Sequence, residues 1–213
     1  MVNFVVSSML PRTFLRRAKK TAKLAGPVYI GFVDSLLIEI PGLLLSGAST
    51  AAAAIVAALA SGSAALWACA AAMIVVTGVR AWDMKRHARA RPSPTVEAAR
   101  RWETRFVVGA VAFMGVLSMW TFIAFAVTED GFVRFMAITV TIPYAFGMWT
   151  RSFAIDRGTN IQALVAFLPL SAAMLIAGGW YPWMIVVGFA PLLIFIKSSS
   201  ALIGLAVGTV RSR

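Results

Sequence analysis

Residues 106–128, FVVGAVAFMGVLSMWTFIAFAVT, decide the fold class of this chain. The stretch contains no Asp, Glu, Lys or Arg, while Arg105 precedes it and Glu129 follows it. A helix needs about 20 consecutive apolar residues to cross a hydrocarbon core about 30 Å thick. A helix also satisfies its own backbone hydrogen bonds where no water is present. We therefore predict a transmembrane helix at 106–128.

The composition extends this prediction to the whole chain. Hydrophobic residues make up 60% of the 213 residues and charged residues 13%, against about 45–50% and about 25% in soluble domains. This balance predicts an all-α fold, a polytopic integral membrane helix bundle of about six transmembrane helices. A basic segment with an interfacial helix is expected at 1–41, one membrane domain at 42–196 and a C-terminal tail at 197–213. The predicted spans are about 42–60, 64–79, 106–128, 132–150, 161–177 and 183–196.

The interfacial helix is predicted at residues 28–40. This segment is apolar but carries Asp34 and Glu39, and Pro41 follows it. A single Asp at the centre of a spanning helix costs about 2.5–3.5 kcal/mol on insertion scales. A helix at the membrane surface avoids that cost, so the first span is placed after Pro41. The two carboxylates stand about 140° apart on a helix, which argues against paired-carboxylate catalysis.

The positive charges are predicted to lie on one side of the membrane. Of the 20 Lys and Arg residues, all but Arg134 fall in the N-terminal segment, in the stretch at 80–105, after the fourth span or near the C-terminal end. Cytoplasmic segments carry an excess of Lys and Arg. Both termini are therefore predicted to be cytoplasmic, in a multi-pass protein of the bacterial inner membrane. Because the +12 net charge is clustered between apolar spans, anionic lipid is favoured as a partner over nucleic acid.

Side chains that carry catalysis or hold cofactors are sparse. Cys69 is the only cysteine and His87 the only histidine, which excludes an internal disulfide and a thiolate metal cluster. His87 lies in the basic stretch near Arg86, so we expect it at the surface and not as a haem or metal ligand. Arg80 is expected at the cytoplasmic interface. We predict no catalytic, metal or cofactor site, and no enzymatic activity.

One candidate contact with a ligand or partner lies near the predicted outer face. Arg134 is the only basic residue predicted on that side. The alternative is a snorkelling side chain or a local ion pair with Glu129 or Asp130 at the rim. The aromatic neighbours that we expect for this contact are Trp180, Tyr181 and Trp183.

Helix packing is predicted at two places. Gly204 and Gly208 stand at the spacing of a helix-association motif, but their apolar surroundings cover only about half a membrane span. Small residues also dominate the first span at 42–60. They are at least as good a candidate for close packing inside the bundle.

Several short motifs add a functional expectation. They are Arg80-Ala81-Trp82-Asp83-Met84, Trp102-Glu103-Thr104-Arg105-Phe106, Gly109-Ala110, Phe113, Thr139-Val140-Thr141, Tyr144, Gly147, Arg151-Ser152-Phe153, Gln162 and Leu168-Pro169-Leu170. With these motifs the chain resembles the membrane-embedded N-terminal half of bacterial cyclic di-GMP signalling proteins over about Val33 to Ser200. In that family a multi-span sensory region precedes a cytoplasmic GGDEF domain, often with an EAL domain behind it. This chain contains neither motif, and its residues 201–205 are apolar where the family implies a charged signalling helix.

Three classes of function are therefore considered. The leading hypothesis is a non-enzymatic sensory or anchoring module that forms a homo-oligomer, motivated by the resemblance and by an expected absence of buried charge. The second is an accessory or structural subunit of a larger membrane complex. The third, a small-solute transporter, ranks last because transport of polar solutes usually leaves ionisable groups at mid-depth or paired broken helices.

Overall fold

The computed structural model describes residues 26–90, 95–152 and 156–186. Within these ranges the chain is helical and contains no strand, which confirms the predicted all-α class. Residues 181–186 begin a further helix. The other helices are α3 (Gly26–Ile38), α4 (Ile40–Ser61), α5 (Ala64–Ala90), α6 (Val96–Val127), α7 (Gly131–Ser152) and α8 (Asp156–Ala177).

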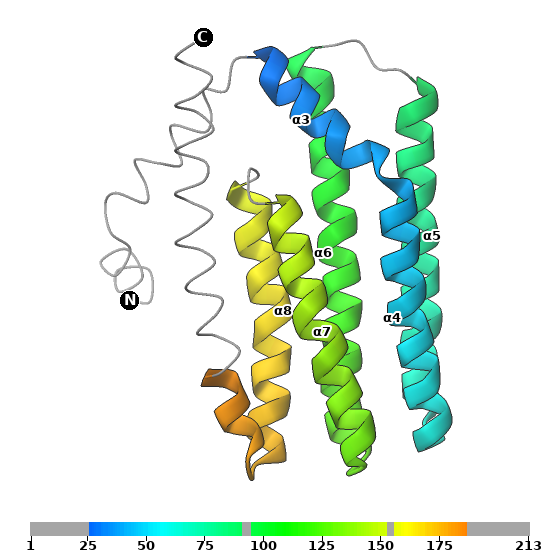
Figure 1. Ribbon diagram of the computed structural model, residues 1–213, viewed down its shortest axis with the longest axis vertical. Coiled ribbons are helices and arrows are strands. Elements are labelled where there is room, and N and C mark those ends of the chain that lie inside the picture. The colour runs from blue at the N-terminus through cyan, green and yellow to red at the C-terminus, as the bar shows by residue number, and fades with distance from the viewer. Residues whose placement is uncertain (1–25, 91–94, 153–155, 187–213) are drawn as a thin grey trace, which may run out of the picture.

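The long helices α4 to α8 run side by side along the long axis of the molecule, and α3 lies across one end (Figure 1). α6 is the central helix, since it packs against α5, α7 and α8 and also contacts α3. α4 pairs with α5 and also touches α7. We call the end formed by residues 80–90 and 95–105 the basic end, and the end formed by residues 61–63 and 128–130 the turn end.

Local signals set the limits of α4. At Glu39 the backbone leaves the helical region, with φ −81° and ψ 58°, and this separates α3 from α4. Pro41 follows in the first turn, where its missing N–H breaks no helical hydrogen bond. At the other end Gly62 adopts the left-handed conformation with φ 66°, and its N–H donates to the Ala58 carbonyl at 2.9 Å. A glycine accepts this conformation without steric cost, so the tight turn between α4 and α5 forms here.

α6 begins with a side-chain cap. The Thr95 hydroxyl accepts a hydrogen bond from the Ala98 N–H at 3.3 Å, and Glu97 lies in the first turn, where a negative charge complements the helix dipole. The helix buries one continuous stripe against its neighbours. The fully buried members of that stripe are Ala110, Phe113, Met114, Leu117, Ser118, Trp120, Thr121 and Ala124.

Four helices of the described chain are long and apolar enough to cross a membrane: Ile40–Ser61, Ala64–Ala90, Val96–Val127 and Gly131–Met148. Most of each apolar window faces outward, because only 33–44% of its residues are buried. Large apolar side chains such as Leu45, Val75 and Phe135 are therefore exposed along the sides of the bundle. A continuous surface of this kind is unusual for a soluble monomer and fits contact with lipid.

The predicted spans differ from the helices in length. α5, the helix of the second predicted span, begins at residue 64 as expected but continues to Ala90. α6 begins ten residues before the predicted span at 106. The basic stretch at 80–105 is therefore mostly helix. A short helix leading into the third span was expected at 95–105, whereas the continuation of α5 through residues 80–90 was not expected. The predicted fifth span lies inside α8, whose apolar part, Leu164–Ala177, is shorter than the four qualifying helices. The predicted sixth span is described only as far as residue 186.

Small residues bring α4 and α5 into close contact, as the sequence predicted for the first span. The buried face of α4 consists mainly of Ala, with Gly47 and Thr50 among them. A Cβ atom built on Gly47 would lie 2.4 Å from Cγ2 and 2.6 Å from Oγ1 of Thr77 on α5. Only glycine fits this position while the two helices keep their separation.

Candidate functional site

The most unusual residue of the described chain is a buried arginine. Arg80 lies on α5 and is only 7% exposed. Its side chain crosses α6 at Gly109, where an added Cβ would meet the Arg80 Cγ at 3.0 Å. The guanidinium carbon stands 5.9 Å from the ring centroids of both Phe106 and Phe113, and Nη1 donates a hydrogen bond to the Tyr144 hydroxyl on α7 at 3.3 Å.

The burial of Arg80 corrects one expectation. The sequence predicted no buried charge, yet packing by α6 and α7 encloses this side chain. An arginine keeps its charge inside proteins, and burial of a charge is costly unless it is paired and hydrogen-bonded. The two ring contacts are each favourable by about 0.5–2 kcal/mol. Among the residues that the structure describes, no carboxylate lies within 4.0 Å of this guanidinium to complete the pairing.

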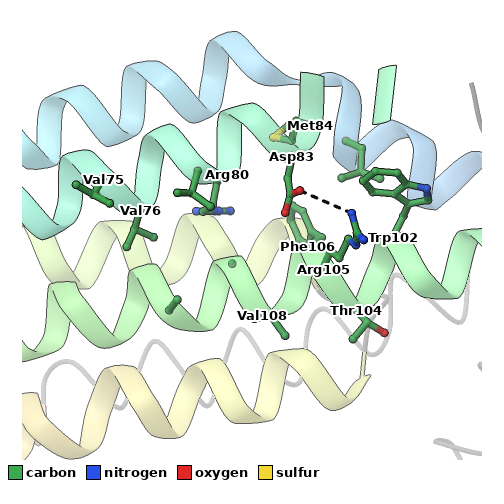
Figure 2. A pocket seen from close by; sticks show the side chains of 14 residues that line it. Val75, Val76, Arg80, Asp83, Met84, Trp102, Thr104, Arg105, Phe106 and Val108 are labelled. Atoms are coloured by element: carbon green, nitrogen blue, oxygen red, sulfur yellow. Dashed lines mark ion pairs between the residues drawn. The ribbon is translucent and has the colours of Figure 1, made fainter. Parts of the chain in front are cut away.

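A groove with a volume of about 340 Å³ runs between α5 and α6 beside Arg80. Figure 2 shows Arg80 with the valines of α5 on one side of it and the Asp83–Arg105 pair on the other. The Arg105 Nη1 and Asp83 Oδ1 atoms are 3.8 Å apart. Both side chains are more than one-third exposed, so this ion pair contributes little stability. The groove is apolar apart from these groups and Thr104.

His87 is buried too, against the expectation of a surface residue. It is 6% exposed, its Nε2 lies 3.1 Å from Asp34 Oδ1 on α3, and its ring meets the Trp102 ring edge-on at 4.8 Å between centroids. Along α5 a buried residue recurs every seven positions, and this repeat continues into the basic stretch. That repeat was the signal that sequence reasoning missed, and its buried members are Leu66, Met73, Arg80 and His87.

A second polar contact holds α3 to the basic end. The Tyr29 hydroxyl donates a hydrogen bond to Glu103 Oε2 on α6. Burial, followed by the Glu103 carboxylate, raises the pKa of Tyr29 above its ordinary value of 10.0. Val33 and Leu37 pack into the core from the same helix. Two polar contacts and an apolar face therefore fix α3 across the ends of α5 and α6.

The predicted outer contact around Arg134 is partly assembled. Its Nε donates to the Thr128 carbonyl at 2.9 Å and its Nη2 to the Phe125 carbonyl at 3.2 Å. The guanidinium carbon lies 5.4 Å from the Phe125 ring centroid and 5.7 Å from that of Tyr181. Arg134 thus satisfies carbonyl groups that the end of α6 leaves without helical partners. Trp180 and Trp183 are exposed, and a ligand at this place stays a prediction.

The remaining predictions concern the Gly204–Gly208 packing motif and metal or cofactor binding. Gly204 and Gly208 lie outside the described residues. Within the part of the chain that the structure describes, no group of three or more His, Cys, Asp or Glu residues could hold a metal ion. Cys69 is a buried free cysteine on α5. The polar groups of interest therefore converge at the basic end, around Arg80 and the α5–α6 groove.

Buried polar side chains also join α6 to α7 and α8. The Thr121 and Thr141 hydroxyls are 2.6 Å apart, and the Ser118 hydroxyl donates to the Ala166 carbonyl at 3.3 Å. Hydroxyl bonds of this kind between membrane helices typically contribute about 0.6 kcal/mol each. Gln162 is fully buried on α8, and neither amide atom has a partner among the described residues. The Thr121–Thr141 and Ser118–Ala166 contacts link α6 to α7 and to α8.

Comparison with known proteins gives no identification. No protein family, no curated protein and no solved structure matches this chain. The resemblance to cyclic di-GMP signalling proteins therefore stays a prediction.

Proposed function

We propose that this chain is a non-enzymatic integral membrane module of the bacterial inner membrane, acting as a sensory or anchoring unit. The observation that carries the proposal is the separation of charge from apolar surface along the bundle. The exposed basic side chains of α5 and of the first turns of α6 gather at one end, next to long apolar sides. They are Lys85, Arg86, Arg89, Arg100, Arg101 and Arg105.

The same separation supports an orientation. The turn end carries Glu129 and Asp130, and its one nearby arginine, Arg134, is engaged by backbone carbonyls. Lys and Arg residues near span ends favour the cytoplasmic side. The basic end is therefore cytoplasmic in our proposal, where anionic headgroups attract it by about 1 kcal/mol per basic residue near the surface. Both termini are cytoplasmic if the chain crosses six times.

A sensory role is supported by the way α3 is held. Asp34 and Tyr29 of α3 contact His87 of α5 and Glu103 of α6 at the basic end. Leu37 of α3 is one of the residues that line the groove. A helix docked by a few contacts at the membrane surface can release or bind when the lipid or a ligand changes. We propose that α3 passes such a change to the N-terminal segment, in line with the resemblance to sensory regions.

Transport remains the less favoured function despite the buried Arg80. The groove that Arg80 lines is walled by two long helices, α5 and α6, with Leu37 of α3 at one end. A solute pathway across the membrane requires access from both sides at one site. A groove between two neighbouring helices fits a ligand that enters from the lipid instead.

Reporter fusions test the orientation and the number of spans. A reporter that is active only outside the cytoplasm should be silent when fused after Arg89 and active when fused at Gly62 or Asp130. Fusion at Gly179 should also be active if α8 crosses the membrane. Activity at Arg89 with silence at Gly62 would overturn the orientation. Silence at Gly179 alone would leave a four-span protein.

Copurification from native membranes separates the two remaining classes. A sensory or anchoring module should be recovered as a homo-oligomer of this chain. Recovery of a different membrane protein in fixed stoichiometry would show an accessory subunit and would overturn the stand-alone function.

A further inference from the structure

The α5–α6 groove changes in polarity along its length. Asp83, Thr104 and Arg105 line it at the basic end, and Val75 and Ala112 line it toward the middle of the bundle. The lining residues cover about ten positions on each helix, which corresponds to about 15 Å at 1.5 Å per residue. That length is about half of a hydrocarbon core about 30 Å thick. With Arg80 and Arg105 at the headgroup level, the apolar part of the groove covers about five to seven positions, so it reaches about 8–10 Å into the membrane.

The charges that line the groove favour an anion. Arg80 and Arg105 supply two guanidinium groups, and Asp83 supplies one carboxylate. Arg80 donates one hydrogen bond within the described chain, to Tyr144, although a guanidinium carries several more N–H donors. The Arg105–Asp83 separation of 3.8 Å is longer than a charge-assisted hydrogen bond of about 2.7–2.9 Å. A phosphate group at the polar end would give the exposed Arg105 a closer acceptor and would lie near the positive charge of the buried Arg80.

The walls of the groove favour an acyl chain. Val75, Val79 and Val108 are each about 60% exposed in the isolated chain and face outward along the apolar sides of the bundle. The groove volume of about 340 Å³ lies within the range of about 300–1,000 Å³ that is typical of small-molecule sites. A soluble anion would contact only the polar end of the groove. An occupant that enters from the bilayer covers them and brings its own charge to the basic end.

We propose that this groove binds one anionic phospholipid, whose phosphate is held by Arg105 next to the buried charge of Arg80 and whose acyl chain lies along Val75, Val79 and Val108. Placement of this lipid in the cytoplasmic leaflet rests on the proposed orientation. Leu37 of α3 and Met84 of α5 also line the groove. The bound lipid therefore contacts α3, the helix that we propose passes a change in lipid or ligand to the N-terminal segment.

Photolabelling locates the lipid directly. The full chain is reconstituted in nanodiscs of phosphatidylcholine with a trace of phosphatidylglycerol that carries a photoactivatable group in its acyl chain, and the labelled peptides are mapped by mass spectrometry. We expect labelling to concentrate on the groove residues of α5 and α6. Added unlabelled phosphatidylglycerol should suppress it, whereas further phosphatidylcholine should not.

Three results would overturn the proposal. Equal labelling of all lipid-facing helices would show general lipid contact only. Equal competition by phosphatidylcholine would show that the charge plays no part. Stronger competition by a free fatty acid than by phosphatidylglycerol would identify a different class of ligand.

Matched variants test the two halves of the site. Val108→Trp fills the groove and should lower groove labelling by about tenfold, the change that a typical overpacking penalty produces. Met119→Trp places the same side chain at an exposed position of α6 outside the groove and should leave labelling unchanged. Equal effects of the two variants would refute an acyl site in the groove.

The headgroup contact has its own pair of variants. Arg105→Gln should remove the preference for phosphatidylglycerol while acyl labelling in phosphatidylcholine persists. Arg86→Gln removes an exposed charge of α5 outside the groove and should keep the preference. Loss of preference in both variants would show a general surface charge effect and would refute the site. Both leaflets of the nanodisc have the same lipid composition, so the labelling results do not depend on which side of the membrane the basic end faces. A wrong orientation would be detected by the reporter fusions alone.

Discussion

Replacement of Gly47 by alanine tests the packing of α4 on α5. The added Cβ would stand 2.4 Å from Cγ2, 2.6 Å from Oγ1 and 3.1 Å from Cβ of Thr77. Rotation of the Thr77 side chain moves the first two atoms but leaves its Cβ in place. The helices must therefore separate by a few tenths of an ångström, or the two side chains must strain. Gly78→Ala is the matched control, because a Cβ at that position meets nothing within 4 Å.

The expected difference follows from two opposing effects. Alanine in a helix interior is more favourable than glycine by about 0.5–1 kcal/mol, and this gain is shared by both variants. Overpacking of a filled interface lowers the free energy of unfolding by about 1–3 kcal/mol. This penalty applies only to Gly47→Ala, because a Cβ at Gly78 meets no atom within 4 Å. Gly78→Ala should therefore be slightly more stable than the unmodified chain. Gly47→Ala should be less stable than Gly78→Ala by about 1–3 kcal/mol.

Equilibrium unfolding in mixed detergent micelles measures both free energies. The double variant Gly47→Ala, Thr77→Ala removes the two closest atoms and should recover most of the loss, with a coupling energy of about 1–3 kcal/mol. A Gly47→Ala protein as stable as Gly78→Ala would show that α4 and α5 are not packed as described. Absence of coupling between positions 47 and 77 would refute the clash as the cause.

Three further predictions concern the ends of the bundle. Arg134→Ala should lower the free energy of unfolding by about 1.5–3 kcal/mol, because it leaves two carbonyls at the end of α6 without their donor; a thermal melt equal to that of the unmodified chain would contradict this capping role. The pKa of Tyr29 is raised in the folded state, so its contribution to stability should be complete below its unfolded value of 10.0 and be lost as the pH rises beyond it. Melting temperatures measured from pH 8 to pH 11 should fall less steeply for Tyr29→Phe, and identical slopes would count against the contact with Glu103. A cysteine at Ser35, on the exposed face of α3, should react with a water-soluble maleimide, whereas one at Leu37, which is 2% exposed, should be protected; equal reactivity would show that α3 is not docked.

Several features of the fold could be read from residue order because they depend on local chemistry. An uncharged stretch of bilayer length forms a helix whatever packs against it, and a glycine in Ser61-Gly62-Ser63 ends α4 because only backbone freedom is required there. The break near Pro41 and the start of a helix at Thr95 are local for the same reason. The length of α5 was underestimated, since Arg and Lys are good helix formers and charge alone does not end a helix.

The candidate site was not predictable to the same extent. Arg80 and Arg134 were both recognised as charges near span ends, but their partners lie on other helices. Arg80 reaches Tyr144, which is 64 positions away in the chain, and His87 reaches Asp34 across 53 positions. A hydropathy pattern assigns each charge to water because it contains no information on these contacts.

Sequence alone determined that this chain forms apolar helices of bilayer length with its basic residues grouped between them, because hydrophobicity and backbone hydrogen bonding act within each segment. Tertiary structure alone decided that Arg80 and His87 are buried, that α3 is held across the basic end and that a groove opens between α5 and α6. Those features arise where separate helices meet. Their energies depend on distances between side chains, which the order of residues does not specify.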